Sequence, residues 1–411
     1  MKKILLITSL AILVSFNSIC CTTAIISGKA TPDGRPILWK HRDTDEFNNK
    51  MMFIKGGKYE YIGLVNSNDS LYQVWAGTNS AGFSIMNSAS YNLKPKDDHT
   101  TLQDQEGMVM KLALATCATI DDFKRLLDSL PKPLGVEANF GLIDAQGGAA
   151  YFETDNFKYK IFDVNDSKVA PDGYLIRTNY SFSGRENEGA GYNRYNTASV
   201  IINEAYKAKK ITPEFFLSKA TLSLRHELTK TDLSNVFKKK EDFQNRMYPF
   251  RDYIVRYSSS STIVVHGVKA GETPSLVTTW VKLGFQPTSI SIPLWVSAGE
   301  TIPGILTAPR TKKALLCTFT LLIKKDCFPF NKGTEGENYI YLEVLGNNSN
   351  TGIMQQNVQF EKDIIAKGEK LEAKWRRLGF DDNEATDFYK EVNESILLYY
   401  SFLCKEKPKE R

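Results

Sequence analysis

"CTTAIISGKATPDGRPILWKHRDTD", residues 21–45, holds two strand-like runs that are separated by a turn signal. The runs CTTAIIS and RPILWKH are rich in apolar and β-branched residues, and Pro32, Asp33 and Gly34 lie between them. Short apolar runs bounded by such residues are typical of a β-hairpin. The stretch therefore predicts that the chain begins with a pair of antiparallel strands.

The register of this hairpin decides which side chains lie near Cys21. A turn centred at Asp33 and Gly34 pairs residues whose numbers sum to about 67, so the expected partner of Ala24 lies near Asp43. Cys21 then lies at the open end of the hairpin, beside the charged run KHRDTD.

The segment before the hairpin has the pattern of a secretory signal peptide. Residues 1–3 are basic, residues 4–16 are apolar but too short to span a bilayer comfortably, and Ser18 and Cys20 are small. We expect a signal peptide over residues 1–20, cleavage between Cys20 and Cys21, and export to the periplasm or the medium. The alternative is a lipid-anchored, ligand-binding surface protein, although Ile19 precedes Cys20 where lipoprotein signals carry a small residue. No later segment has the length and apolarity of a membrane span.

A cysteine at a chain terminus carries a nucleophile and a base on one residue. An α-amino group has an ordinary pKa of roughly 7.7–8.0, so it can accept the thiol proton near neutral pH. In the adjoining charged run, Asp43 can orient the amine. Lys40 and Arg42 can stabilise a thiolate or bind a substrate carboxylate. These residues form the first candidate site.

Composition limits the other classes of function. The formal net charge is only +5, with scattered Lys and Arg, which argues against a nucleic-acid partner. Four widely spaced histidines and the absence of a C-x-x-C pair argue against a zinc site, and we expect no metal or organic cofactor. The expected partner is a small-molecule amide substrate. The oligomeric state stays open, a homo-oligomer included, and so does a disulfide between Cys317 and Cys327.

Periodicity along the rest of the chain predicts an α+β protein with antiparallel sheets. Strand-like runs continue to residue 90, return over 139–180 and again over 251–325, where the last is TFTLLIKK at 318–325. Helical spacing is expected over 106–130, 197–209, 213–224 and 357–404, the last broken near Gly379. The Gly-rich stretch 181–196 is expected to be a mobile loop beside the active site.

Two asparagines are candidate donors to an oxyanion. Asn87 lies in GTNSAGFSIMNSAS and is followed by Ser88 and other small residues that let backbone N–H groups approach a ligand. Asn179 lies in LIRTNYS, at the expected end of a strand. Each asparagine is also a common turn former, so it is their combination with Cys21 that favours a catalytic role.

The order of these motifs resembles that of the N-terminal-nucleophile (Ntn) cysteine hydrolases. CTT, DGRPILWKHRD, GTNSAGFSIMNSAS, NFGLIDAQGGAAYFE, IRTNYS and SSSSTIVVHG follow one another at roughly the family's spacing. The chain resembles the branch that contains acyl-CoA:6-aminopenicillanic acid acyltransferase (peptidase C45), and more distantly choloylglycine hydrolase and penicillin V acylase. The resemblance covers about residues 21–300 and implies a four-layer αββα sandwich of two mainly antiparallel sheets. We expect this domain to span 21–350, and the amphipathic helical pattern predicts 351–411 as a C-terminal extension packed on the same domain.

The resemblance also implies roles for particular residues. Cys21 matches the nucleophile and Asp43 the aspartate at its amino end. Asn87, with the Ser88 backbone N–H, matches one side of the oxyanion hole, and Asn179 matches the other.

Arg256, before the serine run, matches an active-site arginine more loosely. The bile-salt branch has Arg-Asn where this chain has Lys40 and His41, so the substrate contacts of that branch do not transfer directly.

Together these features predict an exported hydrolase of linear amides, of a non-peptide or N-acyl amino acid type, acting through a thioester at Cys21. Transfer of the acyl group to another amine would use the same chemistry. A site outside the cytoplasm disfavours CoA as the acyl donor, which favours hydrolysis.

Overall fold

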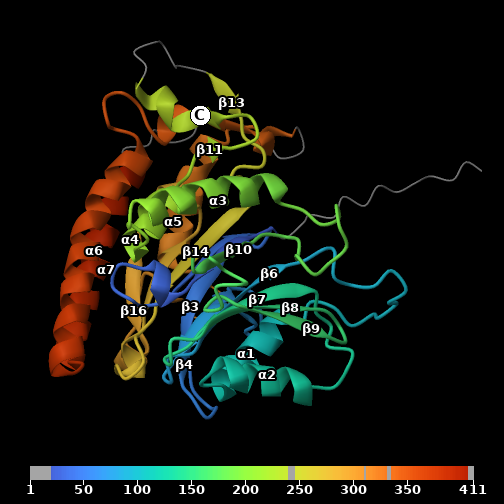
Figure 1. Ribbon diagram of the computed structural model, residues 1–411. Coiled ribbons are helices and arrows are strands. Elements are labelled where there is room, and N and C mark those ends of the chain that lie inside the picture. Colours follow the sequence, from blue (N-terminus) through green and yellow to red (C-terminus); the bar gives the residue numbers. More distant parts are fainter. Residues whose placement is uncertain (1–19, 239–245, 310–311, 331–334, 406–411) are drawn as a thin grey trace, which may run out of the picture.

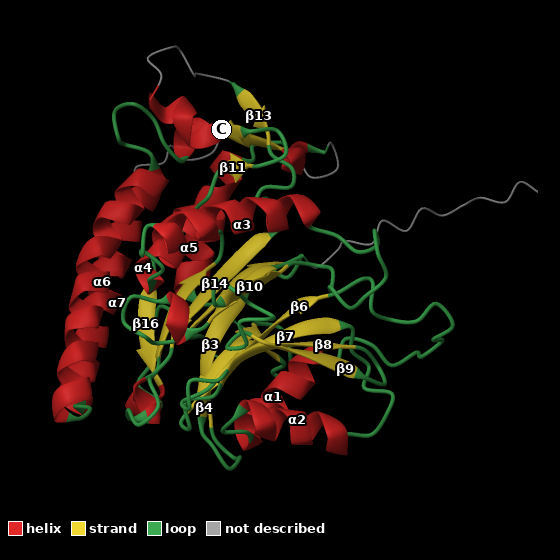
Figure 2. Cartoon of the chain, in the orientation of Figure 1, coloured by secondary structure: helices red, strands yellow, loops and turns green. Residues whose placement is uncertain are grey.

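Two antiparallel sheets form the centre of the molecule, and helices cover them on both sides (Figure 2). The computed structural model describes residues 20–238, 246–309, 312–330 and 335–405. The expected signal peptide therefore lies, apart from Cys20, outside the described residues.

The six-stranded sheet has the order β10 (Tyr174–Arg177), β1 (Thr22–Ile26), β2 (Ile37–Asp43), β14 (Ser259–His266), β15 (Thr278–Leu283), β16 (Ile292–Trp295). The seven-stranded sheet has the order β3 (Asn49–Ile54), β4 (Tyr61–Asn66), β5 (Val74–Asn79), β6 (Ser84–Ala89), β7 (Ala138–Ile143), β8 (Ala149–Thr154), β9 (Tyr159–Asp163).

The apolar side chains of each sheet alternate between two hydrophobic cores. In β1, Ile25 is fully buried in the core between the sheets, together with Met86 of the facing β6. Its neighbours Ala24 and Ile26 point to the opposite side, where they contact helical residues such as Ile202. Side chains alternate sides along a strand, so an uninterrupted apolar run marks a strand that is covered on both faces.

Helices complete the outer layers (Figure 1). α1 (Glu106–Thr116) and α2 (Ile120–Ser129) pack on the seven-stranded sheet, where Phe123 meets Phe140 and Phe152 edge to face. α3 (Tyr192–Lys207) and the short α4 (Pro213–Phe215) pack on the six-stranded sheet. The order helix, sheet, sheet, helix confirms the predicted four-layer αββα architecture.

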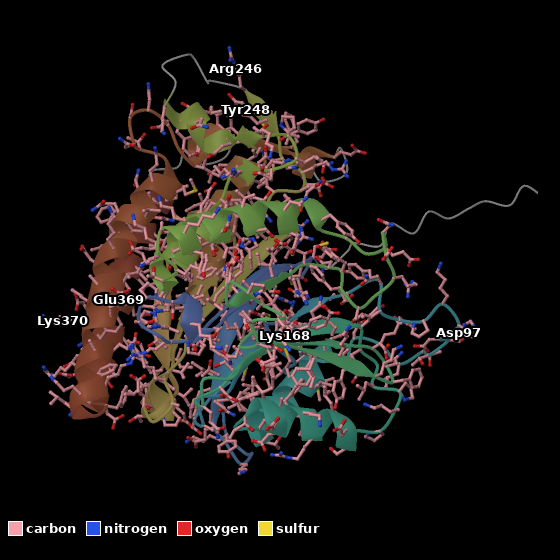
Figure 3. The ribbon with its side chains drawn as sticks, in the orientation of Figure 1. Asp97, Lys168, Arg246, Tyr248, Glu369 and Lys370 are labelled. Atoms are coloured by element: carbon pink, nitrogen blue, oxygen red, sulfur yellow. The ribbon has the colours of Figure 1, made fainter. Side chains whose placement is uncertain are left out.

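The C-terminal residues form the expected helical pair, α6 (Ile353–Leu378) and α7 (Asp382–Lys405). Trp375 of α6 packs edge to face against Trp295 of β16, so the pair shares a core with the six-stranded sheet. Glu369 and Lys370 are exposed on the outer face of α6 (Figure 3). None of the helices in the described residues has the length and hydropathy of a membrane span. Two small two-stranded sheets complete the described strands: β11 (Arg225–His226) with β12 (Thr231–Asp232), and β13 (Met247–Pro249) with β17 (Tyr339–Tyr341). β11 contacts α3, and β17 contacts α5 (Leu315–Cys327).

The predicted hairpin forms, but its predicted register is wrong. Ala24 pairs with Trp39 rather than with a residue near Asp43. β1 ends at Ile26, and Ser27 then caps a 3₁₀ turn, so the connection is longer than a tight turn at Asp33 and Gly34. The connection includes more residues before Pro32 than the predicted turn does. Each residue of β1 therefore pairs with a residue nearer the start of β2 than predicted.

The helical spacing expected over 106–130 is confirmed by two helices, α1 and α2, which are separate because Thr119 and Asp122 form a capping box that starts α2. Another expectation about local structure is wrong. The expected strand at 318–325 belongs to α5 (Leu315–Cys327), whose buried residues recur at helical spacing. The Thr, Phe and Ile residues of this run favour a strand by propensity, but the segment forms a helix because it buries one helical face against the rest of the protein.

The remaining differences concern the cysteines and the helices after residue 190. Cys317 and Cys327 are not joined by a disulfide. They lie ten residues apart on one helix, about 15 Å along its axis, which is too far for a disulfide. α3 begins at Tyr192, inside the stretch expected to be a loop. The helix expected over 213–224 is only α4 and one π-helical turn.

Candidate active site

Cys21 lies immediately before β1, which is flanked by β2 and β10 in the six-stranded sheet. The residue is 2% exposed, and its backbone nitrogen donates a hydrogen bond to Oδ1 of Asn179 over 3.0 Å. That nitrogen is joined to Cys20 here, and it is the atom that cleavage between Cys20 and Cys21 converts into the α-amine. The amine would therefore start out with an acceptor already in place.

Asn179 connects the two sheets at this point. Its Oδ1 accepts a second hydrogen bond from Arg194 over 2.7 Å, while its Nδ2 donates to the carbonyl of Ala89 at the end of β6 over 2.8 Å. The Asn179 side chain therefore joins the nitrogen of Cys21 to α3 (Tyr192–Lys207) and to the seven-stranded sheet.

A polar network holds the segment that carries Asn179. Asn139 of β7 donates to the carbonyls of Thr178 and Tyr180 and accepts from the Ser181 hydroxyl over 2.6 Å. The backbone N–H of Ser181 donates to Oδ1 of Asn92 over 2.8 Å. The start of the loop expected to be mobile is therefore tied to the seven-stranded sheet by several buried hydrogen bonds.

Asp43 ends β2 and is fully buried. Its carboxylate accepts hydrogen bonds from Arg256 over 2.6 Å and from the Ser259 hydroxyl over 2.7 Å, and His41 lies 3.5 Å away. Burial alone would raise the pKa of Asp43, but Arg256 and His41 outweigh it and hold the pKa well below its usual range. The carboxylate therefore stays ionised.

Arg256 connects Asp43 to the bond before the nucleophile. The same Nη2 atom that contacts Asp43 also donates to the carbonyl of Cys20 over 3.2 Å. Among the described residues, Asp43 thus reaches Cys21 through Arg256, whereas the sequence had suggested a direct contact with the amine. The paired carboxylate holds the pKa of Arg256 above its usual range despite burial, so the guanidinium is charged.

Lys40 lies between the two sheets and contacts Asn87. Its Nζ donates to Oδ1 of Asn87 and to the carbonyl of Trp75, both over 2.7 Å. Burial lowers the pKa of Lys40 to about 7, although the nearby Cys21 opposes this effect. Lys40 therefore supports Asn87 directly, and its charge depends on pH in the neutral range.

Arg42 lies near the nucleophile as well and is 2% exposed. Its guanidinium donates to Asn49 over 2.5 Å and to Asn66 over 3.0 Å, and it lies 5.0 Å from the ring centre of Trp75. Its position in the interior makes it an electrostatic neighbour of Cys21, and each of its two terminal nitrogens donates one of these hydrogen bonds.

Ser88 follows Asn87 in β6 and pairs with Asn139 of β7. Its hydroxyl accepts a hydrogen bond from Asn139 over 3.2 Å. The β6 end thus approaches Asn179 from the second sheet. The structure brings the sequence-predicted residues into one region, where the two sheets face each other at the end of β1.

Sequence reasoning missed Arg194, which donates hydrogen bonds to both Cys21 and Thr22 at the amino end of β1. Arg194 lies in the first turns of α3, is 1% exposed, and donates to the carbonyl of Cys21 over 2.5 Å. It also donates to the Thr22 hydroxyl over 3.0 Å. The one available signal was its Gly-rich context, GAGYNR, because no local pattern places a residue of a helix against a strand 173 positions away.

Comparison with known families decides the membership of the chain. A family model described as acyl-coenzyme A:6-aminopenicillanic acid acyl-transferase matches residues 31–272. The chain belongs to this acyl-transferase family. The matched range includes Asp43, Asn87, Asn179 and Arg256 and begins after Cys21, so the match does not extend to the predicted nucleophile. A search of curated proteins found no match.

Solved structures similar to this member of the acyl-transferase family include three hydrolases. A variant of conjugated bile acid hydrolase from Clostridium perfringens has 12% identity and a TM-score of 0.41, covering 67% of this chain and 93% of that chain. A Caenorhabditis elegans ortholog of N-acylethanolamine-hydrolyzing acid amidase has 14% identity and a TM-score of 0.38, covering 62% and 93%. Penicillin V acylase from Agrobacterium tumefaciens has 13% identity and a TM-score of 0.40, covering 68% and 86%.

Proposed function

We propose that the chain is an exported cysteine amidohydrolase that cleaves a linear amide through a thioester on Cys21. The observation that carries the proposal is the hydrogen bond from the Cys21 nitrogen to the fixed Oδ1 of Asn179. Once cleavage after Cys20 frees that nitrogen, an amine with an oriented lone pair lies on the same residue as the thiol. Membership of the acyl-transferase family supports the same chemistry.

The first step is the formation of the thioester. The α-amine takes the thiol proton, and the thiolate attacks the carbonyl carbon of the amide. The developing oxyanion is stabilised by nearby donors, and the proton on the α-amine passes to the leaving nitrogen as the C–N bond breaks. The products of this step are the free amine and a Cys21 thioester.

Arg256 and Asn179 are proposed as the donors to the oxyanion. Arg256 already donates to the carbonyl next to Cys21, and its buried Nε has no acceptor among the described residues. After Cys20 leaves, these donors can bind a substrate carbonyl instead. Asn87 and the Ser88 backbone, with Lys40 holding Asn87, are proposed to line the opposite side.

The second step decides between two activities. Water attacks the thioester, the tetrahedral intermediate collapses, and the acid and the free thiol are released. An amine in place of water would give acyl transfer by the same route, which the family match favours as the second candidate. Added hydroxylamine or a primary amine distinguishes them, because an acyltransferase converts the acyl group mainly to the new amide.

The test combines the mature N-terminus with a substrate panel. Intact mass and N-terminal sequencing of exported protein should show a free Cys21, whereas a diacylglyceryl cysteine with a blocked amine would refute the mechanism. Release of free amine is then measured for N-acyl amino acids, penicillin V and conjugated bile salts. Cys21→Ala and Cys21→Ser should abolish turnover of any substrate that the parent cleaves. Full activity in Cys21→Ala would refute the proposal.

A further inference from the structure

Arg194 contacts three parts of the candidate site at once. Its Nη1 donates to the Cys21 carbonyl and the Thr22 hydroxyl, and its Nη2 donates to Oδ1 of Asn179. The same Oδ1 accepts from the Cys21 nitrogen over 3.0 Å. Because both nitrogens bond one oxygen, the guanidinium lies within about 6 Å of the future amine.

The surrounding backbone makes room for this guanidinium. Gly191 precedes α3 with a φ of 88°, and a Cβ on it would lie 2.3 Å from Nη2 of Arg194. Real Cβ atoms do not approach another atom so closely. The glycine at position 191 therefore allows Arg194 to reach Asn179. The backbone at the start of α3 is thus compatible with this contact only because position 191 has no side chain.

Arg194 is a buried cation without a carboxylate of its own. Among the described residues no carboxylate lies within ion-pair distance of it, whereas Arg256 is paired with Asp43. Burial lowers the pKa of Arg194 to about 10, so the group remains charged at neutral pH. A buried unpaired charge is costly, so a counter-charge that forms during the reaction is a physical reason for keeping it.

We propose that Arg194 is a positioning residue that holds Asn179 and the Cys21 backbone in line and, through its unpaired positive charge, favours the neutral amine over the ammonium. A neutral amine is the form that can accept the thiol proton, and the resulting thiolate is the missing negative partner of Arg194. This inference rests on the proposed function, because it assumes that cleavage frees the Cys21 nitrogen.

Other titratable groups also lie around the amino end of Cys21, and their effects have to be separated from that of Arg194. From β2 come Lys40, Arg42 and Asp43, from the segment before β14 comes Arg256, and from the segment after β6 comes Tyr91. All of them are retained when only Arg194 is changed. A shift measured for Arg194→Gln against the parent therefore reports the Arg194 charge and its hydrogen bonds.

The direct test titrates the amine without requiring a substrate. In the Cys21→Ala background, the rate at which an acylating reagent modifies the α-amine is measured against pH by mass spectrometry of the N-terminal peptide. Arg194→Gln should raise the apparent pKa of the amine by about one to two pH units, the effect of one charge about 6 Å away at an effective dielectric of about 20. Arg225→Gln, which removes an arginine paired with Glu204 of α3, is the matched control and should leave the titration unchanged.

Arg194→Lys separates the charge from the geometry. It keeps the cation but not the forked contact, so the amine should titrate within about 0.5 units of the parent. In the active Cys21 enzyme, kcat should fall about ten-fold because Asn179 is no longer fixed.

Equal titration of the parent and Arg194→Gln overturns the inference while leaving the proposed function intact. A blocked or uncut N-terminus overturns both. If Arg194→Gln does not fold, an unchanged kcat in Arg194→Lys overturns the positioning role, and a lowered kcat with an unshifted amine supports it.

Discussion

Asp43→Asn replaces a fully buried carboxylate with an amide of nearly the same shape. In the parent, the carboxylate accepts from Arg256 over 2.6 Å and from Ser259 over 2.7 Å. The amide keeps the shape and loses the charge, so Arg256 becomes a largely buried cation without its anion. We expect both the free energy of unfolding and the activity to fall.

The magnitude follows from the burial of the pair. The Asp43 side chain is 0% exposed and the Arg256 side chain 15% exposed, so solvent screens the pair only slightly. Removal of one member of such a pair costs about 3–5 kcal/mol, because the other charge is left buried and uncompensated. Removal of both members, in Asp43→Asn/Arg256→Met, should cost less than Asp43→Asn alone.

The assay is urea unfolding followed by tryptophan fluorescence for the parent, the two single variants and the double variant. We expect a coupling energy of at least about 2 kcal/mol at pH 7. The pKa of Asp43 is lower in the folded state than in the unfolded state, so the pair stabilises the protein above about pH 4 and its contribution is lost as pH falls further. The difference in the free energy of unfolding between the parent and Asp43→Asn should therefore become smaller as the pH falls below about 4. If the losses in the free energy of unfolding of the two single variants add up to that of the double variant within about 0.5 kcal/mol, the reasoning is refuted.

Two further predictions concern stability away from the site. His266 lies 2.9 Å from Asp33 and 3.1 Å from Glu372, and these carboxylates raise its pKa to about 9 despite burial. The stabilisation from His266 is therefore present below about pH 6.5 and lost as pH rises through about 9, so His266→Gln should lower Tm at pH 6 and match the parent near pH 10. A pH-independent gap in Tm would contradict this. Gly284→Ala places a Cβ 1.8 Å from the Thr320 hydroxyl at a φ of +78°, and should cost about 2 kcal/mol in urea unfolding. Thr320→Ala in the same chain should recover part of that loss, and no recovery would exclude the clash as its cause.

Local pattern predicted the parts of the fold that depend on neighbouring residues. The strands of the first hairpin, the antiparallel α+β class and the pair α6 and α7 follow from apolar periodicity, because each element buries a face that its own residues define. The stacking of two sheets was implied only by the family resemblance. The same reasoning failed at α5, where β-branched and aromatic residues favoured a strand. There the contacts of Cys317 with Phe47 and of Thr320 with Leu283 come from distant segments, which no local window contains.

The sequence by itself predicted a nucleophile at Cys21 and contained the motifs that resemble the family. A cysteine at a proposed cut site has its chemistry whatever the fold, since the thiol and the amine belong to one residue. Only the tertiary structure decided what that residue touches. The pairing of Ala24 with Trp39, the route from Asp43 through Arg256, and the contact of Arg194 with Cys21 each depend on chain segments far apart in sequence.

The physical reason is the range of the interactions involved. Propensity and periodicity act within a few residues, so they can place a strand but not its register or its neighbours. A hydrogen bond or an ion pair between segments 173 or 213 residues apart exists only after the sheets have stacked and α3 has packed on them. Cys21 could be proposed from the sequence alone, whereas its contacts with Asn179 and Arg194 are properties of the fold.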